Sequence, residues 1–254
     1  MSEEIRMTEI MAVAGARELH DGETVVMGLG LPQIAGVLAK RTHAPRLTSL
    51  LEIGVVNTNP IDTPAGLADS RIFYGATCWS GFLDILGMNL HRGVVDVGFL
   101  GTLELDRYGN INTTLLKDDA GKVQYFNGSA GGNDVASLAK RVLIIMRHEK
   151  RKLPAAVSHI TSPGFAGGKT RAELGLRGGG PHRVITDMAV MGFDAVTRAA
   201  TLLSIHPGVK LAQVIENTGF PLQVPSNLPE TLPPTAEELR LLREEIDPKR
   251  VYLK

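Results

Sequence analysis

The chain has 254 residues, in which 27 lysines and arginines are balanced by 27 aspartates and glutamates, and it contains one cysteine, Cys78. Balanced charge provides no general attraction to nucleic acid or to an anionic membrane, so we expect neither as a partner. A single cysteine excludes an intrachain disulfide and a CxxC metal or redox motif, which favours a reducing, cytoplasmic location. The seven histidines show no HxxxH or HExxH spacing, so we predict no metal site.

Apolar runs of strand length alternate with helical patterns along the chain. This alternation predicts an α/β fold with an open, largely parallel sheet and flanking helices. Helices are predicted over 7–19 and over 32–40, the second with Pro32 near its first turn. Strands are predicted over 24–28, 47–55, 94–100, 142–146 and 184–190.

Two stretches lack periodicity and are predicted to be irregular. The segment 163–181 contains seven glycines and is predicted to be a long loop, to which we assign no function. The segment 219–234 contains five of the 14 prolines and is predicted to be an extended strap. A capping-box pattern that starts at Thr235 predicts a final helix over 235–246 that packs through one apolar edge. Because no repeat or linker is found, we predict a single domain over 1–254.

A first glycine turn, Gly28-Leu-Gly30-Leu-Pro32, connects a predicted strand to a predicted helix. Backbone amides at such a helix N-terminus are able to receive an anion or an oxyanion. The dinucleotide-binding fingerprint requires glycine at position 33, where Gln33 stands, so a Rossmann cofactor site is not expected. The alternative for this segment is a tight turn that binds no ligand.

A carboxylate, Glu52, stands at the end of an apolar run, Leu50-Leu51-Glu52-Ile53-Gly54. A carboxylate in such surroundings costs free energy unless it is paired or functional. Gly54 lets a backbone segment or a ligand approach closely. Because ligands bind outside the carboxyl ends of parallel strands, Glu52 is a candidate catalytic residue. The alternative is a glutamate that faces solvent or forms a salt bridge.

A second glycine turn has the sequence Phe126-Asn-Gly128-Ser129-Ala-Gly131-Gly132-Asn133 and precedes an apolar helical pattern. A nucleophile elbow, GxSxG, requires glycine at position 127, where Asn127 stands. We therefore interpret the turn as a set of backbone N–H groups that form an anion nest or an oxyanion hole. A plain loop is the alternative.

Seven segments, taken together and in order, resemble the β subunits of class I CoA-transferases and are most similar to the glutaconate CoA-transferase branch. The similarity covers about 7–248. The segments are Gly28-Leu-Gly30-Leu-Pro32, Leu51-Glu52-Ile53-Gly54, Asp106-Arg-Tyr-Gly-Asn-Ile-Asn112, Gly128-Ser-Ala-Gly-Gly132, His148-Glu-Lys-Arg151, Thr161-Ser-Pro-Gly164 and Glu216-Asn-Thr-Gly-Phe220.

The resemblance implies an open α/β fold of the NagB/RpiA-like type. It also implies an α subunit of similar fold as partner, in an αβ complex or a multiple of it. Coenzyme A is then a substrate, and no cofactor is permanently bound. The implied reaction is a ping-pong transfer of CoA between an acyl-CoA and a carboxylic acid, such as a glutaconate-like dicarboxylate or a 3-oxo acid.

Within that family a β-subunit glutamate at the start of a short E-x-G motif is the nucleophile, and Glu52 matches it. The resemblance implies a glutamyl-CoA thioester on this residue, with Gly54 beside it. It also implies that Gly131 and Gly132 form the oxyanion or thioester-binding turn, and that Gly28 and Gly30 form a neighbouring turn. Many relatives have Ser-Glu-Asn-Gly here, whereas this chain has Leu-Glu-Ile-Gly, and apolar flanks should desolvate the carboxylate.

Two other hypotheses remain open. In the first, Glu52 acts as a general base on water, in a CoA-ester hydrolase or in a ring-opening or decarboxylating enzyme on the same fold. In the second, the chain is a non-catalytic sensing or structural subunit. The acyl donor and acceptor are not predicted.

Three further segments are given structural interpretations. Asp106-Arg-Tyr-Gly-Asn-Ile-Asn112 is predicted to be a turn, because Gly-Asn supports positive φ. The pair Cys78-Trp79 is predicted to pack inside the protein. The basic run 147–152 is predicted to be a solvated strand end, with contact to a CoA phosphate as the alternative.

Overall fold

The computed structural model describes residues 4–60, 63–66, 69–118 and 120–254. The chain divides into two compact units. Unit 1 comprises Met1–Phe99 with Leu232–Lys254, and unit 2 comprises Leu100–Thr231. The single domain over 1–254 stays a prediction.

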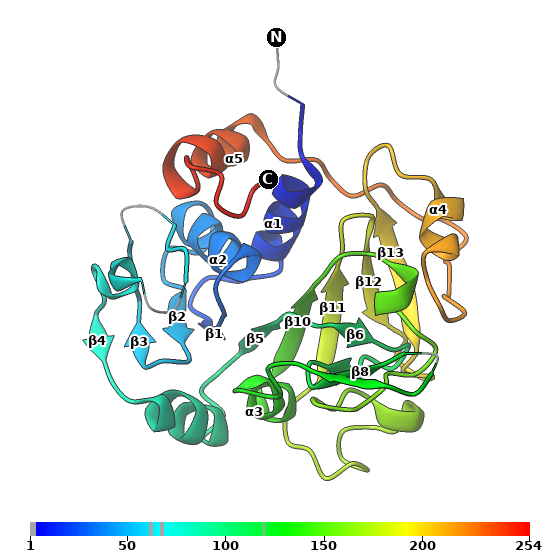
Figure 1. Ribbon diagram of the computed structural model, residues 1–254. Helices are drawn as coiled ribbons and strands as arrows, with labels where there is room; N and C mark the ends of the chain where they lie inside the picture. Colours follow the sequence, from blue (N-terminus) through cyan, green and yellow to red (C-terminus); the bar gives the residue numbers. More distant parts are fainter. Residues whose placement is uncertain (1–3, 61–62, 67–68, 119) are drawn as a thin grey trace. The chain divides into compact units, whose positions relative to one another are not determined.

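Unit 1 is built on strands in the order β5-β1-β2-β3-β4 (Figure 1). The strand β1 pairs in parallel with both β2 and β5, whereas β3 and β4 are added antiparallel beyond β2. The strands are β1 (Thr24–Val26), β2 (Thr48–Leu51), β3 (Val55–Val56), β4 (Cys78–Trp79) and β5 (Val97–Leu100). The helices are α1 (Met7–Arg17), α2 (Leu31–Arg41), η1 (Ser70–Phe73), η2 (Leu83–Asn89), α5 (Ala236–Arg240) and η5 (Leu241–Ile246).

The helices α1, α2 and η5 pack against one another and bury the apolar side of unit 1 (Figure 1). Two ion pairs fasten the C-terminal segment to α1. Arg243 Nε lies 2.7 Å from Glu9 Oε1, and Arg17 Nη2 lies 2.7 Å from Glu238 Oε2. The backbone N–H of Glu238 donates to Thr235 Oγ1 at 3.2 Å, so the predicted capping box is confirmed.

Unit 2 is built on strands in the order β13-β12-β11-β10 (Figure 1). The strands β10 and β11 are parallel, and β12 and β13 are added antiparallel. These strands are β10 (Arg141–Ile145), β11 (Pro181–Ile185), β12 (Ala189–Phe193) and β13 (Ala200–Ile205). Two hairpins, two α-helices and two 3₁₀ turns accompany them: β6 (Glu104–Leu105) with β7 (Ile111–Asn112), β8 (Leu115–Lys117) with β9 (Val123–Tyr125), α3 (Gly132–Leu138), α4 (Leu211–Glu216), η3 (Lys150–Lys152) and η4 (Ala166–Gly168).

The predicted α/β class is confirmed, and each unit combines parallel strand pairs with antiparallel ones. Helices are found where 7–19 and 32–40 predicted them, and strands where 24–28, 94–100 and 142–146 predicted them. The single strand predicted over 47–55 is wrong, because residues 52–54 form a turn between β2 and β3. The single strand predicted over 184–190 is wrong too. There, Thr186 Oγ1 accepts the N–H groups of Met188 and Ala189 and turns the chain from β11 into β12.

The two irregular stretches take the predicted forms. The stretch 163–181 is a loop with the short η4, and its last residue, Pro181, begins β11. The strap runs beside β13, where Leu202 N donates to Gln223 O at 2.8 Å and Thr231 N donates to Ile205 O at 2.7 Å.

The predicted burial of Cys78 and Trp79 is wrong. Both are exposed, and the side chain of Trp79 is 69% exposed. Successive residues of a strand face opposite sides, so neither side of β4, the edge strand, is covered by the described residues of unit 1. The Trp79 ring packs edge-to-face with Phe73, with 5.9 Å between the ring centroids. None of the described helices is long and apolar enough to cross a membrane.

Candidate active site

Glu52 lies in a tight turn at the carboxyl end of β2. The turn is closed by the N–H of Gly54, which donates to Leu51 O at 2.9 Å, and the chain returns as β3 with Val55 opposite Leu51. Since β2 pairs in parallel with β1, the prediction that Glu52 follows a parallel strand is confirmed. Ligands of α/β sheets bind at this edge.

The glycine at position 54 is required by a close backbone contact. Its φ is +102°, and a Cβ atom there would lie 2.1 Å from the carbonyl oxygen of Ser80. The N–H of Ser80 donates to Gly54 O at 2.8 Å. The approach of another backbone segment, which was one of the two predicted reasons for this glycine, is therefore found.

The Glu52 side chain is half-buried and unpartnered. Leu51 beside it is buried and Ile53 is half-buried. The Glu52 carboxylate makes no hydrogen bond or ion pair with any described residue, so the salt-bridge alternative is not found there. A carboxylate held in a rigid turn without an internal partner is available to a ligand.

The turn that contains Gly28 and Gly30 leaves the same sheet edge beside Glu52. Met27 N donates to Leu50 O at 3.1 Å, which continues the parallel pairing of β1 and β2 up to this turn. Gly30, with φ +92°, is the N-cap of α2. A Cβ atom on Gly28 would have no atom within 4 Å, so the space next to it is open. The structure therefore brings Gly28, Gly30, Glu52 and Gly54 together at one edge of unit 1.

Gly131 and Gly132 belong to unit 2, at the start of α3. The N–H of Gly132 donates to Ser129 O at 2.8 Å, and that of Asn133 donates to Ser129 Oγ at 3.1 Å. These two N–H groups are used within the turn. The N–H of Gly131, the N-cap of α3, has no acceptor among the described residues.

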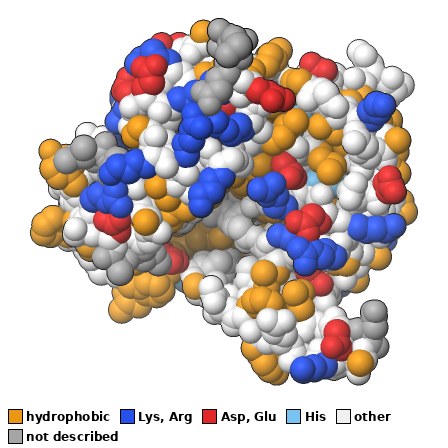
Figure 2. Space-filling model, turned by 45° about the horizontal axis from the view of Figure 1, so that its top comes forward, with side chains coloured by type: hydrophobic (Ala, Val, Ile, Leu, Met, Phe, Trp, Pro, Cys, Tyr) orange, Lys and Arg blue, Asp and Glu red, His pale blue; other side chains and the backbone are white. Residues whose placement is uncertain are grey.

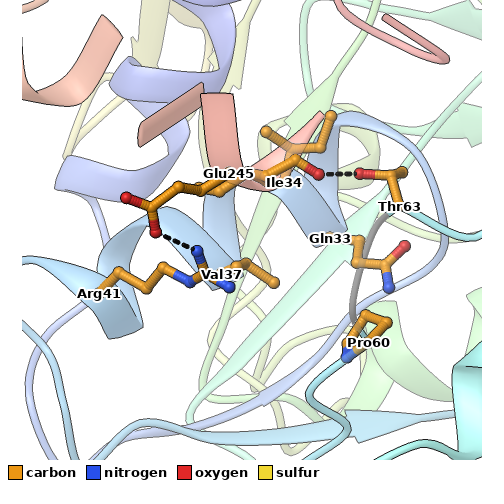
Figure 3. A pocket seen from close by; sticks show the side chains of 8 residues that line it. Gln33, Ile34, Val37, Arg41, Pro60, Thr63 and Glu245 are labelled. Carbon is orange, nitrogen blue, oxygen red and sulfur yellow. Dashed lines mark hydrogen bonds and ion pairs between the residues drawn. The ribbon is translucent and has the colours of Figure 1, made fainter. Parts of the chain in front are cut away.

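Gln33 is a polar group near this edge that the sequence patterns did not single out. It lies in the first turn of α2, its side chain is 3% exposed, and its carboxamide oxygen and nitrogen have no hydrogen-bond partner among the described residues. Figure 3 shows it, next to Thr63 and Pro60, among the residues that line a cavity of about 10 Å³. The lining also includes Arg41 and Glu245, whose ion pair joins atoms 2.7 Å apart. A volume of this size holds about one water molecule. A glutamine on the buried face of a helix is the sequence signal for such a site.

The predicted turn at 106–112 is confirmed as the connection between β6 and β7. Asp106 Oδ1 accepts the N–H of Tyr108 at 2.9 Å and that of Asn110 at 3.1 Å, and Gly109 has a φ of +71°. This pattern is a structural Asx turn.

The basic run 147–152 is solvated at its arginines and buried at its histidine. Arg147 and Arg151 have side chains that are 59% and 80% exposed. His148 is buried, with Nδ1 at 2.9 Å from Thr186 Oγ1 and Nε2 at 3.0 Å from Thr218 Oγ1. Burial lowers the pKa of His148 to about 4, so this histidine is neutral at pH 7. The prediction of a solvated segment is therefore wrong for His148.

No group of three or more histidine, cysteine, aspartate or glutamate side chains in the described part of the chain is placed to hold a metal ion. The chemistry that these residues offer is that of a nucleophilic or basic carboxylate beside backbone N–H donors.

Comparison with known proteins gives a consistent result. The family model of coenzyme A transferase matches residues 8–217. The chain is 38% identical to one of the subunits of 3-oxoadipate CoA-transferase from Pseudomonas knackmussii, over 92% of this chain and 91% of that protein. The crystal structure of glutaconate coenzyme A-transferase from Acidaminococcus fermentans matches with a TM-score of 0.91 and 32% identity, over 99% of this chain and 98% of that one. The crystal structure of the decarboxylase AibA/AibB matches with a TM-score of 0.83 and 27% identity, over 97% of each chain.

Proposed function

The chain belongs to the coenzyme A transferase family, and we propose that it is the β subunit, whose Glu52 is the nucleophile of CoA transfer. The observation that carries this proposal is the unpartnered, half-buried Glu52 carboxylate in a turn at the carboxyl end of β2. Partial removal of a carboxylate from water without an internal donor costs free energy, which binding of a substrate would offset.

The first half-reaction loads CoA onto the enzyme. The Glu52 carboxylate attacks the carbonyl carbon of the acyl-CoA thioester, and the CoA thiolate leaves, which forms a mixed acyl-glutamyl anhydride. The thiolate then attacks the glutamyl carbonyl and expels the acyl group as a free carboxylate. Glu52 now carries CoA as a glutamyl thioester.

The second half-reaction repeats these steps in reverse. The carboxylate of the acceptor acid attacks the glutamyl thioester, and CoA leaves as the thiolate. The thiolate attacks the acyl carbonyl of the new anhydride, which releases the new acyl-CoA and restores the Glu52 carboxylate. No proton needs to be stored on the enzyme, because carboxylates and thiolates act as both nucleophiles and leaving groups.

Each addition passes through a tetrahedral oxyanion that requires N–H donors. We assign this role to the turn of Gly131 and Gly132, in which the N–H of Gly131 has no acceptor among the described residues, and to the turn of Gly28 and Gly30 beside Glu52. Loss of one such donor typically raises the barrier by about 3 kcal/mol. Gly54 serves the site by holding the nucleophile's turn against Ser80.

Coenzyme A is a substrate in this scheme, and no cofactor is permanently bound. The names of two relatives, 3-oxoadipate CoA-transferase and glutaconate coenzyme A-transferase, favour a dicarboxylic acid, a 3-oxo acid or an acid of both kinds as the acyl group. The exposed free thiol of Cys78 favours a reducing, cytoplasmic location.

An α subunit is the proposed partner, in an αβ complex or a multiple of it. Unit 1 has an apolar surface that supports a partner, and Figure 2 shows hydrophobic side chains at the left margin, where Figure 1 draws β3 and β4. Exposed large hydrophobic side chains in neighbouring segments mark interaction sites. We define the apolar surface of unit 1 by its exposed residues Phe73, Tyr74, Trp79, Phe82, Leu83 and Met88.

The match to a decarboxylase favours a second candidate, in which Glu52 acts as a general base. Three reactions fit that role, namely hydrolysis of a CoA ester, decarboxylation of an acyl-CoA and ring opening of an acyl-CoA. None of them passes CoA to an acceptor acid.

The test is an assay of the chain co-expressed with its partner on a panel of acyl-CoA donors, with acetate and dicarboxylates as acceptors. If the complex transfers CoA, a new acyl-CoA should form only when the acceptor acid is present. The Glu52→Gln variant should not form it. Release of free CoA or CO₂ at a rate unaffected by the acceptor would establish the second candidate. Full activity of Glu52→Ala in the assembled complex would assign catalysis to the partner.

A further inference from the structure

The glycine-rich loop 163–181 of unit 2 is organised by one buried arginine. Arg171 is 8% exposed, and its guanidinium donates four hydrogen bonds to backbone carbonyls. Nε donates to Gly178 at 3.0 Å, Nη1 to Pro163 and Gly164 at 2.8 Å each, and Nη2 to Ala136 of α3 at 2.5 Å. Arg171 therefore links the two ends of the loop to each other and to α3.

Two glycines of this loop fit against the chain between α3 and β10. A Cβ atom on Gly178 would lie 2.6 Å from Ala139 O, and one on Gly179 would lie 2.0 Å from Lys140 O. The N–H groups of both glycines donate to carbonyls of the α3 end, at 2.8 and 3.1 Å. Their small size brings the loop next to Lys140, at the amino end of β10.

A cavity of about 300 Å³ lies at this end of unit 2. It is placed where the parallel strands β10 and β11 begin and where β12 ends. Its lining includes His182 and Asp194, which is the only carboxylate among the described lining residues. Four cationic side chains line it as well, those of Lys140, Arg141, Arg183 and Arg198.

The carboxylate of Asp194 accepts hydrogen bonds within its own turn and also interacts electrostatically with Arg198. Its Oδ1 accepts the N–H of Val196 at 3.0 Å, the N–H of Thr197 at 2.6 Å and the hydroxyl of Thr197 at 2.9 Å. Glu173, another carboxylate near Arg198, binds the N–H and hydroxyl of Thr170 through Oε2. Cationic groups therefore outnumber the carboxylates around the cavity.

Arg198 stands in an unfavourable backbone conformation on the cavity wall. Its φ is +60°, in the connection between β12 and β13, where glycine or asparagine is usual. Its Nε atom is buried and has no hydrogen-bond partner among the described residues, and its guanidinium lies over the Phe165 ring, with Cζ 5.8 Å from the ring centroid. Both the backbone conformation and the buried, unpaired Nε donor cost free energy, which is unusual for a residue with no role.

We propose that this cavity binds a phosphate-bearing ligand other than the reacting CoA. The Arg198 guanidinium donates hydrogen bonds to phosphate oxygens, for which its planar geometry is suited. Lys140, Arg141 and Arg183 take part in other interactions as well and contribute positive charge. The volume is at the lower end for small-molecule sites, which matches a phosphate ester more closely than a whole CoA molecule.

Within unit 2, this site is separated from the turn of Gly131 and Gly132, to which we assign oxyanion binding. Ligands of open α/β sheets react at the carboxyl ends of parallel strands, whereas the cavity lies at the amino ends of β10 and β11. The turn of Gly131 and Gly132 lies at the N-terminus of α3. The cavity lies beyond the C-terminus of α3, where Lys140 lines it. A helix of this length spans about 10 Å.

The test measures binding of sodium phosphate, ADP and CoA to the complex of the full chain with its partner, by calorimetry at constant ionic strength. We expect phosphate and ADP to bind, and Arg198→Gly to weaken both by about tenfold or more. Glycine is the informative replacement because it adopts φ +60° freely, so this variant should unfold at a temperature at least as high as the wild type. Lys169→Gln, which removes an exposed positive charge from the glycine-rich loop 163–181 outside the cavity, is the control and should bind as the wild type does.

Three results would overturn the proposal. The first is no binding of phosphate or ADP above a chloride-matched blank. The second is equal weakening by Arg198→Gly and Lys169→Gln, which would indicate nonspecific attraction. The third is binding of CoA alone, with Arg198→Gly raising the KM for acyl-CoA, which would assign the cavity to the substrate. An unchanged KM together with lost ADP binding supports a separate site, whichever reaction Glu52 performs.

Discussion

The backbone carbonyl oxygen of Ser80 lies 2.1 Å from the position that a Cβ atom on Gly54 would occupy. The same two residues are joined by a hydrogen bond from Ser80 N to Gly54 O at 2.8 Å. The turn that carries Glu52 is therefore fixed from the side of β4, and the nucleophile's position depends on a residue 26 positions beyond Gly54 in the chain.

Gly54→Ala is predicted to disable the site. The added methyl group must push the turn of Glu52 away from Ser80, and a displacement of about 1 Å in a catalytic group costs about 100-fold in rate. The steady-state rate of the assembled complex measures the effect. Gly22→Ala is the matched control, because Gly22 also has a positive φ, +84°, but no atom within 4 Å of its Cβ position. Wild-type activity in Gly54→Ala would show that the turn does not position the nucleophile.

Trp79→Lys is predicted to weaken assembly with the α subunit. Trp79 is 69% exposed on the apolar surface of unit 1, and a buried aromatic residue at an interface typically contributes about 2 kcal/mol or more. Sedimentation of the two co-purified chains over a dilution series measures the change. Val196→Lys, at an 85% exposed position in unit 2, is the control. Equal dissociation constants for wild type and Trp79→Lys would remove this surface from the interface.

Stability is predicted to fall as the pH drops from about 6.5 toward 4. Burial lowers the pKa of His148 to about 4, more than the nearby Asp187 raises it, so the unfolded chain takes up a proton that the folded chain does not. The neutral, buried His148 contributes fully to the free energy of unfolding above about pH 6.5. As the pH falls below that value, the free energy of unfolding decreases by up to about 3 kcal/mol. Urea unfolding of the chain between about pH 7.5 and 4.5 measures this loss.

His148→Gln is predicted to reduce this pH dependence, and His206, whose pKa burial also lowers, retains part of it. The matched control is His159→Gln at an exposed position, which should keep the wild-type slope. If the free energy of unfolding of His148→Gln depends on pH as strongly as that of the wild type, His148 is not a buried, neutral histidine.

Gln33→Met is predicted to stabilise the isolated chain by about 1 kcal/mol, because it replaces a buried, unpaired carboxamide with an apolar group of similar size. Thermal unfolding measures the change, with Gln124→Met at an exposed position of β9 as the control. A loss of stability would show that a bound water or ligand satisfies Gln33.

Local signals predicted the parts of the fold that neighbouring residues determine. The capping box at Thr235 and the carboxyl-end position of Glu52 follow from short patterns and apolar periodicity. The turn after Leu51 was missed because it needs Ser80 against Gly54, a contact between distant segments.

Burial was misjudged where distant partners decide it. His148 is buried within a basic run because Thr186 and Thr218 supply its hydrogen bonds. Trp79 is exposed although tryptophan is usually well buried, since nothing among the described residues of unit 1 covers β4. The role of Arg171 in the glycine-rich loop could not be predicted from the sequence. Its hydrogen-bond acceptors are backbone carbonyls, which every residue has, so no sequence pattern marks them.

The most direct test of the account is mass spectrometry of the assembled complex after incubation with acyl-CoA, with and without borohydride. If Glu52 is the nucleophile of CoA transfer, it carries CoA as a thioester, and borohydride reduces this thioester to an alcohol on the Glu52 side chain and stops transfer. An acceptor acid added before borohydride should prevent the modification. An unmodified Glu52 in a complex that is turning over substrate would contradict the central claim.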